Sequence, residues 1–168
     1  MMDRPPTSTE EAFRAFIRTF GLLKRVMEPY FSQYGISDSQ WGVLRALHRA
    51  QEEGDEALRL TDLGERLLIR PPSVTGVVDR LQRSGLVKRV ACPTDLRVKY
   101  VRLTARGREL VRRVLQRHLE KIESIMAGLD ATEQRTLNQL LGQLGSHLNS
   151  LAASNQDAGQ ETPANDEV

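Results

Sequence analysis

Leu60–Gly107 reads LTDLGERLLIRPPSVTGVVDRLQRSGLVKRVACPTDLRVKYVRLTARG. Its apolar residues first recur every three or four positions and then alternate with polar ones, which is typical of two short helices followed by two strands. This order predicts a winged helix-turn-helix. Such a unit places its second helix in the major groove of DNA and its hairpin against the flanking backbone or minor groove.

The second helix, expected from Pro72 to Ser84, is the predicted recognition helix, and its proline suits a first helical turn. Its predicted inward stripe consists of Val74, Val77, Val78 and Leu81. Short side chains and a glycine near its beginning permit close approach to base edges. Gly85 is expected to end the helix in the left-handed conformation that glycine adopts at low cost.

The hairpin is expected to comprise LVKRVA, a turn around CysProThrAsp, and RVKYVRLT. We expect Val87, Val101 and Leu103 to pack on the helices, and Lys88, Arg89, Lys99 and Arg102 to point outward. Arg97, just after the turn, is the candidate for an arginine that reaches the minor groove. Asp95 is expected to fix the turn or orient Arg97 rather than to contact DNA.

Positive charge is concentrated in this part of the chain. Residues 70–113 hold twelve lysines and arginines and three acidic residues, a net charge of +9, whereas the whole chain has a formal charge of +2. A local field of this kind suits phosphate contact and counterion release, although a solvated basic surface is the plainer alternative. The candidate DNA-contacting residues are Arg70, Pro72, Ser73, Thr75, Gly76, Arg80, Arg83, Lys88, Arg97 and Lys99.

Helices are predicted on both sides of the winged unit. The first runs from about Ser8 to Gln33, with a kink or an early stop at Pro29. The next begins at caps within Ser37–Ser39 and buries Trp41, Leu44 and Leu47. Leu58–Leu60 is expected to add a short strand, and Thr61 to cap the helix that follows. Thr104 caps one long helix near the end, and Asp130 with Glu133 forms a capping box for the other.

The last helix carries leucines at spacings of four and three, a heptad seam over about two heptads. An apolar helix at each end of a short chain predicts a symmetric dimer that buries both, and an intramolecular bundle is the alternative. The candidate dimer residues are Phe13, Ile17, Leu137, Leu141, Leu144, Leu148 and Leu151.

The expected fold is mainly α with a small β-wing, a winged helix-turn-helix domain inserted in a helical dimerisation frame. The DNA-binding domain spans residues 37–103. Residues 1–36 and 104–153 form the frame, and the polar stretch 154–168 is expected to be a disordered tail.

Other function classes find little support in the sequence. No apolar run is long enough to span a membrane, and the N-terminus lacks a signal core, so a cytoplasmic location is expected. Catalytic and cofactor-binding motifs are not found, and His48, His118 and His147 lack metal-ligand spacing, so we expect neither an enzyme nor a cofactor or metal. Cys92 is expected to be a tolerated surface cysteine, and a redox sensor is the less favoured alternative, suggested by nearby basic residues that favour a thiolate.

The chain resembles the MarR family of bacterial transcriptional regulators, named for multiple antibiotic resistance. The resemblance rests on SDSQWGVLRAL, LTDLGERLLIRPPSVTGVVDRLQRSGLVKR and DLRVKYVRLTARG. It implies an obligate dimer in which Ser73, Thr75 and Gly76 lie at the groove and Arg97 is the wing arginine. Arg80 would meet phosphate or brace the domain. Adjacent prolines at 71 and 72 and the glycine at 76 depart from many members, so the base preference does not transfer.

The resemblance also implies a mechanism, in which a repressor leaves a palindromic operator when a small ligand changes the spacing of its recognition helices from roughly 34 Å. The ligands implied are phenolic or aromatic carboxylate compounds bound between the dimer helices and the winged domain. Candidate lining residues are Phe20, Trp41, Leu44, Arg45 and His48, for which a place in the core or in solvent is the alternative. A second hypothesis is an architectural DNA-binding or interaction protein without operator specificity, which sequence-dependent binding would distinguish.

Overall fold

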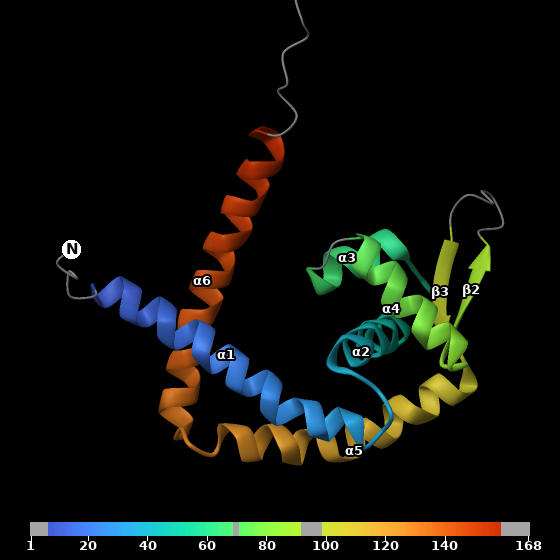
Figure 1. The fold of residues 1–168 in the computed structure, drawn as a ribbon, viewed down its shortest axis with the longest axis horizontal. Coiled ribbons are helices and arrows are strands. Elements are labelled where there is room, and N and C mark those ends of the chain that lie inside the picture. Colours follow the sequence, from blue (N-terminus) through green and yellow to red (C-terminus); the bar gives the residue numbers. More distant parts are fainter. Residues whose placement is uncertain (1–6, 69–70, 92–98, 159–168) are drawn as a thin grey trace, which may run out of the picture. The chain divides into compact units, whose positions relative to one another are not determined.

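A computed structural model describes residues 7–68, 71–91 and 99–158, and its helices and strands are shown in Figure 1. In chain order they are α1 (Ser8–Ser32), α2 (Asp38–Glu52), β1 (Leu58–Arg59), α3 (Leu60–Leu67), α4 (Pro71–Arg83), β2 (Val87–Ala91), β3 (Lys99–Leu103), α5 (Ala105–Met126) and α6 (Ala131–Ala158). The mainly α fold with a small β-wing is therefore confirmed. The chain forms two compact units, and the division between them lies between Arg117 and His118.

The first unit contains the winged helix-turn-helix. Figure 1 shows α2, α3 and α4 gathered beside the sheet, whose antiparallel strands are in the order β1-β3-β2. The core is apolar. Its fully buried side chains come from α2, α3, α4, β2 and β3, and Leu58 of the two-residue β1 is 4% exposed. Among them are Leu44, Leu63, Val78, Leu81, Val87 and Val101. The helix α4 therefore rests on a continuous core, which fixes the direction of its outer face.

The end of α1 is anchored to the winged unit. Met27, Tyr30 and Phe31 are its buried residues, and Phe31 stacks on Trp41 with 5.7 Å between ring centroids. The hydroxyl of Tyr30 donates to the carbonyl of Val114 in α5 at 2.9 Å. The helix continues three residues beyond Pro29, so the alternative of an early stop there is wrong. The carbonyl of Pro29 still accepts from the N–H of Gln33 at 3.2 Å, because proline lacks a donor but keeps its acceptor.

A tight junction joins the end of α4 to the beginning of α5. Gly85 has φ +70°, as predicted, and its carbonyl accepts from the hydroxyl of Thr104 at 2.7 Å. The Thr104 hydroxyl oxygen also accepts from the N–H of Gly107 at 3.0 Å, which confirms the predicted cap. At Gly107 a Cβ would lie 2.0 Å from the carbonyl oxygen of Leu86. The first turn of α5 thus touches the backbone that follows α4.

Two local predictions were wrong. Leu58–Arg59 does form a strand, but α3 begins at Leu60, and the N–H of its cap residue Arg59 donates to the Asp62 carboxylate at 3.2 Å. The cap is therefore not Thr61, because Asp62 lies three residues after Arg59 and reaches its backbone. The helix α6 extends to Ala158, so residues 154–158 are helical, and the rest of the expected tail lies outside the described residues.

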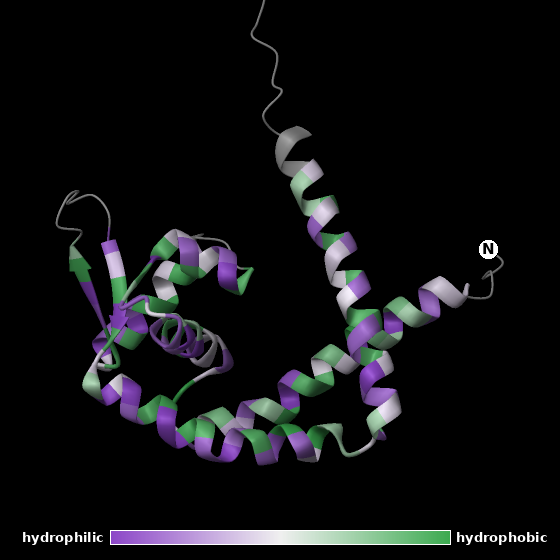
Figure 2. Cartoon of the chain, turned by 180° about the vertical axis from the view of Figure 1, so that it is seen from behind, coloured by the Kyte–Doolittle hydropathy of each residue, from purple (hydrophilic) through white to green (hydrophobic). Residues whose placement is uncertain are grey.

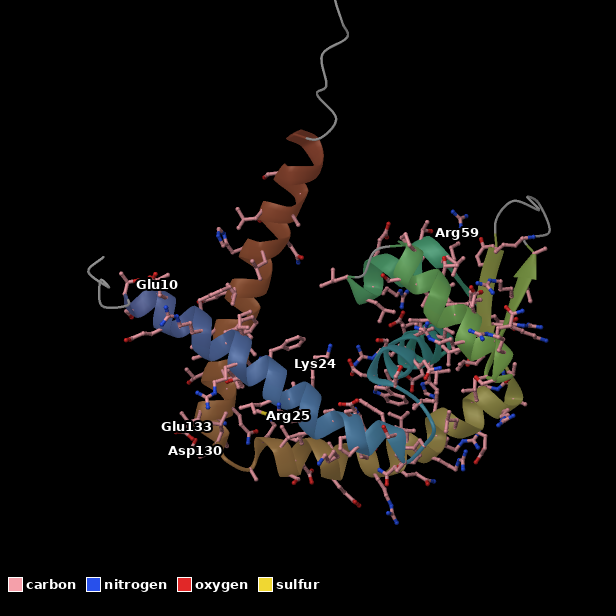
Figure 3. All side chains as sticks on the ribbon, in the orientation of Figure 1. Glu10, Lys24, Arg25, Arg59, Asp130 and Glu133 are labelled. Atoms are coloured by element: carbon pink, nitrogen blue, oxygen red, sulfur yellow. The ribbon has the colours of Figure 1, made fainter. Side chains whose placement is uncertain are left out.

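The capping box at the beginning of α6 is confirmed, and Figure 3 shows Asp130 and Glu133 together there. The N–H of Asp130 donates to Glu133 at 2.8 Å, and the N–H of Glu133 donates to Asp130 at 2.9 Å. The Ser37 cap of α2 is confirmed as well.

Most of the exposed large apolar side chains lie on α1 and α6, and Leu119 and Ile122 of α5 are exposed as well. Figure 2 shows hydrophobic residues recurring among polar ones along α6, where Leu140, Leu141, Leu144, Leu148 and Leu151 are exposed and Leu137 is half-buried. On α1 the exposed apolar residues include Phe13, Phe16, Ile17, Phe20 and Leu23. No helix in the described part of the chain is long and apolar enough to cross a membrane.

Candidate nucleic-acid interface

The helix α4 has one buried face and one exposed face. Val74, Val77, Val78 and Leu81 are buried, as their spacing predicted. The exposed side chains include Pro72, Ser73, Thr75, Arg80 and Arg83, and Gly76 is half-buried. The residues predicted to approach DNA from this helix therefore share its accessible side.

Gly76 is not required by packing inside the chain. A Cβ at this position would lie 3.8 Å from Nη1 of Arg80, an ordinary contact, and would meet no backbone. Because Gly76 has no Cβ, the helix surface is low between the exposed side chains of Ser73 and Arg80. Such a surface permits the backbone to approach a base edge closely.

Four exposed cations lie on this helix and on the wing strands: Arg80 and Arg83 on α4, and Lys88 and Lys99 on β2 and β3. Within the described part of the chain, none of the four forms an ion pair. Because no acidic side chain among the described residues neutralises them, their charges are available to phosphate groups.

Arg89 does not point outward, so that prediction was wrong. The strand register pairs Arg89 with Val101, which places it on the buried face of the hairpin. Its guanidinium forms an ion pair with Asp79 of α4 at 2.7 Å and donates to the amide oxygen of Gln82 at 2.7 Å. These contacts tie β2 to the recognition helix.

Arg102 is also held within the chain rather than pointing freely outward. It lies half-buried on β3 and forms an ion pair with Glu56 at 3.7 Å. The positive charge of the wing is therefore partly used to hold the domain together. The charge presented to solvent is smaller than the count along the sequence suggests.

The five residues predicted to line a ligand pocket have different surroundings. Trp41 and Leu44 are buried in the core, whereas Phe20 is exposed on α1. Arg45 and His48 lie 3.5 and 3.4 Å from the Glu52 carboxylate. A cavity of about 430 Å³ lies nearby, between the last turns of α1 and the beginning of α2.

None of those five residues lines the cavity. Its lining residues are Lys24, Glu28, Ser32, Gly35, Ile36, Ser37, Asp38 and Ser39, and Figure 3 shows Lys24 on α1. Only a weak signal in the sequence points to it, since polar residues recur on α1 at positions 24, 28 and 32 beside a serine-rich helix start.

Four residues considered from the sequence, Arg70, Cys92, Asp95 and Arg97, lie outside the described residues. His48, His118 and His147 lie on three different helices. Among the described residues, no group of three or more His, Cys, Asp or Glu side chains is placed to hold a metal ion.

Comparison with known proteins identifies the family. The sequence model of the MarR family matches residues 34–97. The transcriptional regulator FarR of Neisseria gonorrhoeae is 33% identical over 116 residues, which cover 69% of this chain and 76% of FarR. The chain belongs to the MarR family. The homoprotocatechuate degradative operon repressor of Escherichia coli is 30% identical over 113 residues, which cover 67% of this chain and 73% of that repressor.

A solved structure agrees with this assignment. A mutant MarR from E. coli, in complex with operator DNA, matches with a TM-score of 0.71 and 25% identity over 79% of this chain and 93% of that one. The MarR-family chain is therefore a DNA-binding transcriptional regulator with a winged helix-turn-helix. Its relatives are transcriptional regulators, not enzymes.

Proposed function

We propose that this MarR-family chain is a homodimeric repressor that binds a palindromic operator and is released by a small phenolic or aromatic carboxylate. The observation that carries the proposal is the exposed face of α4. It combines short polar side chains at the beginning of the helix with Arg80 and Arg83, which are exposed at its end.

The exposed side chains of α4 divide into two roles. Ser73 and Thr75, with Gly76 between the serine and Arg80, meet base edges in the major groove. Arg80, Arg83, Lys88 and Lys99 meet phosphates on either side, where they fix the position of the helix without reading sequence. Arg70 and Arg97 are further candidates from the sequence pattern.

A second copy of the chain covers the exposed apolar faces of α1 and α6. Leu144 is 39% exposed and Leu148 50% exposed on α6, and Phe13 is 65% exposed on α1. Several exposed apolar side chains on one helix are typical of protein interfaces. A twofold dimer presents two recognition helices to two half-sites, so a palindrome follows from the symmetry.

The ligand occupies the cavity between α1 and α2, whose volume of about 430 Å³ lies in the usual range for small-molecule sites. The Lys24 ammonium pairs with a carboxylate, and Glu28 and Asp38 accept hydrogen bonds from phenolic hydroxyls. The repression of a homoprotocatechuate operon by a relative supports this ligand class. Arg45 and His48 form a less favoured site, because both would first have to release Glu52.

The test uses an operator duplex selected from random DNA with the purified protein. We expect tight binding to that duplex, and release when homoprotocatechuate is added but not when cyclohexanol is added. The K24M variant should bind the duplex normally and respond much less to the ligand. Equal binding to a scrambled duplex would instead favour the architectural alternative, and a full ligand response from K24M would place the ligand elsewhere.

A further inference from the structure

Leu68 has an unusual position between α3 and α4. Its backbone is left-handed, with φ 53° and ψ 38°, and it is the one residue other than glycine with positive φ among the described residues. Its N–H donates to the carbonyl of Glu65 at 3.2 Å, which closes α3. Its side chain is 85% exposed, more than any other large apolar residue in the described ranges.

Both properties are unfavourable in the free protein. A left-handed residue that ends a helix is usually glycine, because a Cβ is strained there. An exposed leucine also leaves apolar surface in water. Glycine would remove both costs at once, so nothing in the described fold of the free chain explains a leucine at this position.

The location of Leu68 indicates what covers it. It lies three residues before Pro71, the first residue of α4, and three peptide units span at most about 11 Å. Pro72 and Ser73, which follow, are exposed at the beginning of the recognition helix. The exposed leucine therefore lies within a few residues of the beginning of the helix proposed to enter the major groove.

We infer that Leu68 is a further DNA-contacting residue, whose side chain leaves water by packing against apolar groups of the operator at the edge of the groove. DNA offers thymine methyl groups in the major groove for such a contact. The inference rests on the proposed function. Because leucine carries no charge, it strengthens binding without releasing counterions from the DNA, which distinguishes its contribution from that of Arg80.

The experiment compares wild type, L68G and L68A on the selected operator duplex at several salt concentrations, together with thermal unfolding of each free protein. L68G removes the side chain and the strain, whereas L68A removes most of the side chain and keeps the strain. Both variants should bind roughly fivefold to tenfold more weakly, as for partial loss of a buried leucine, with an unchanged salt slope. L68G should unfold at a higher temperature than L68A.

Wild-type affinity in both variants would overturn the inference and leave the proposed function intact. Weak binding by L68G with wild-type affinity in L68A would also overturn it, because backbone stiffness rather than the side chain would then be responsible. A lower salt slope in both variants would show disturbed phosphate contacts and likewise refute it. Failure of the wild type to prefer the operator would refute the proposed function and this inference together.

Discussion

At the junction between α4 and α5, packing opposes the higher helix propensity that alanine would have in place of Gly107. Gly107 lies in the first turn of α5, where alanine would be favoured over glycine by about 1 kcal/mol in an unhindered helix. Here, however, the added methyl group would lie 2.0 Å from the carbonyl oxygen of Leu86, 3.0 Å from its carbonyl carbon and 3.3 Å from Cδ2 of Leu103. The first two atoms belong to the backbone, so no change of rotamer relieves the contact.

The expected effect of G107A on stability is the packing cost of the added methyl group less the gain in helix propensity. Forcing an extra methyl group into a packed site costs typically about 1–3 kcal/mol, and backbone on the opposing side puts this site near about 3 kcal/mol. The propensity gain offsets about 1 kcal/mol. The net loss of about 2 kcal/mol corresponds to a fall of about 4–8 °C in the unfolding temperature for a chain of this length.

Thermal unfolding followed by circular dichroism, at one protomer concentration for all proteins, tests this prediction. The matched control is G142A. Gly142 lies inside α6, where an added methyl group would have no neighbouring atom within 4 Å, and it shares a helix face with Asn138 and Ser146 rather than with the leucines. G142A should therefore unfold at the wild-type temperature or slightly above. A G107A protein as stable as wild type would refute the packing argument.

Three further predictions concern DNA binding and assembly. R80A should weaken operator binding and lower the slope of log affinity against log salt concentration by about one unit, because Arg80 neutralises one phosphate. An unchanged slope in a titration at several salt concentrations would contradict this contact. R89M should weaken operator binding severalfold at an unchanged salt slope, because it removes the ion pair with Asp79 that holds β2 to α4. A salt slope lower by about one unit would instead show that Arg89 contacts a phosphate. L144R should dissociate the dimer and abolish operator binding, since it places an unpaired charge in the seam, and a monodisperse dimer in ultracentrifugation would contradict the seam.

Local chemistry determines the parts of the fold that the sequence predicts well. The inward stripe of α4 follows from helical period, and the caps at Thr104 and Asp130 depend on residues within three positions. Short-range signals fail where two candidates compete. Thr61 and Asp62 both suit a cap, and the carboxylate reaches the backbone of Arg59.

Contacts between elements explain the remaining errors. Because side chains alternate along a strand, Arg89 lies on the same face as Val87, although its charge had predicted that it points into solvent. That charge is tolerated inside because Asp79 and Gln82 approach from α4, a contact that no strand pattern contains. The cavity beside Lys24 depends in the same way on how the end of α1 meets α2, whereas the sequence drew attention to aromatic residues that lie in the core or in solvent.

We propose that this MarR-family regulator recognises a particular operator through α4. The most direct test titrates the purified protein against its selected palindrome and a scrambled duplex of the same length and composition, at several salt concentrations. We expect at least a roughly thousandfold preference for the palindrome at physiological salt. Equal affinity for the two duplexes, falling together and steeply as salt rises, would contradict it.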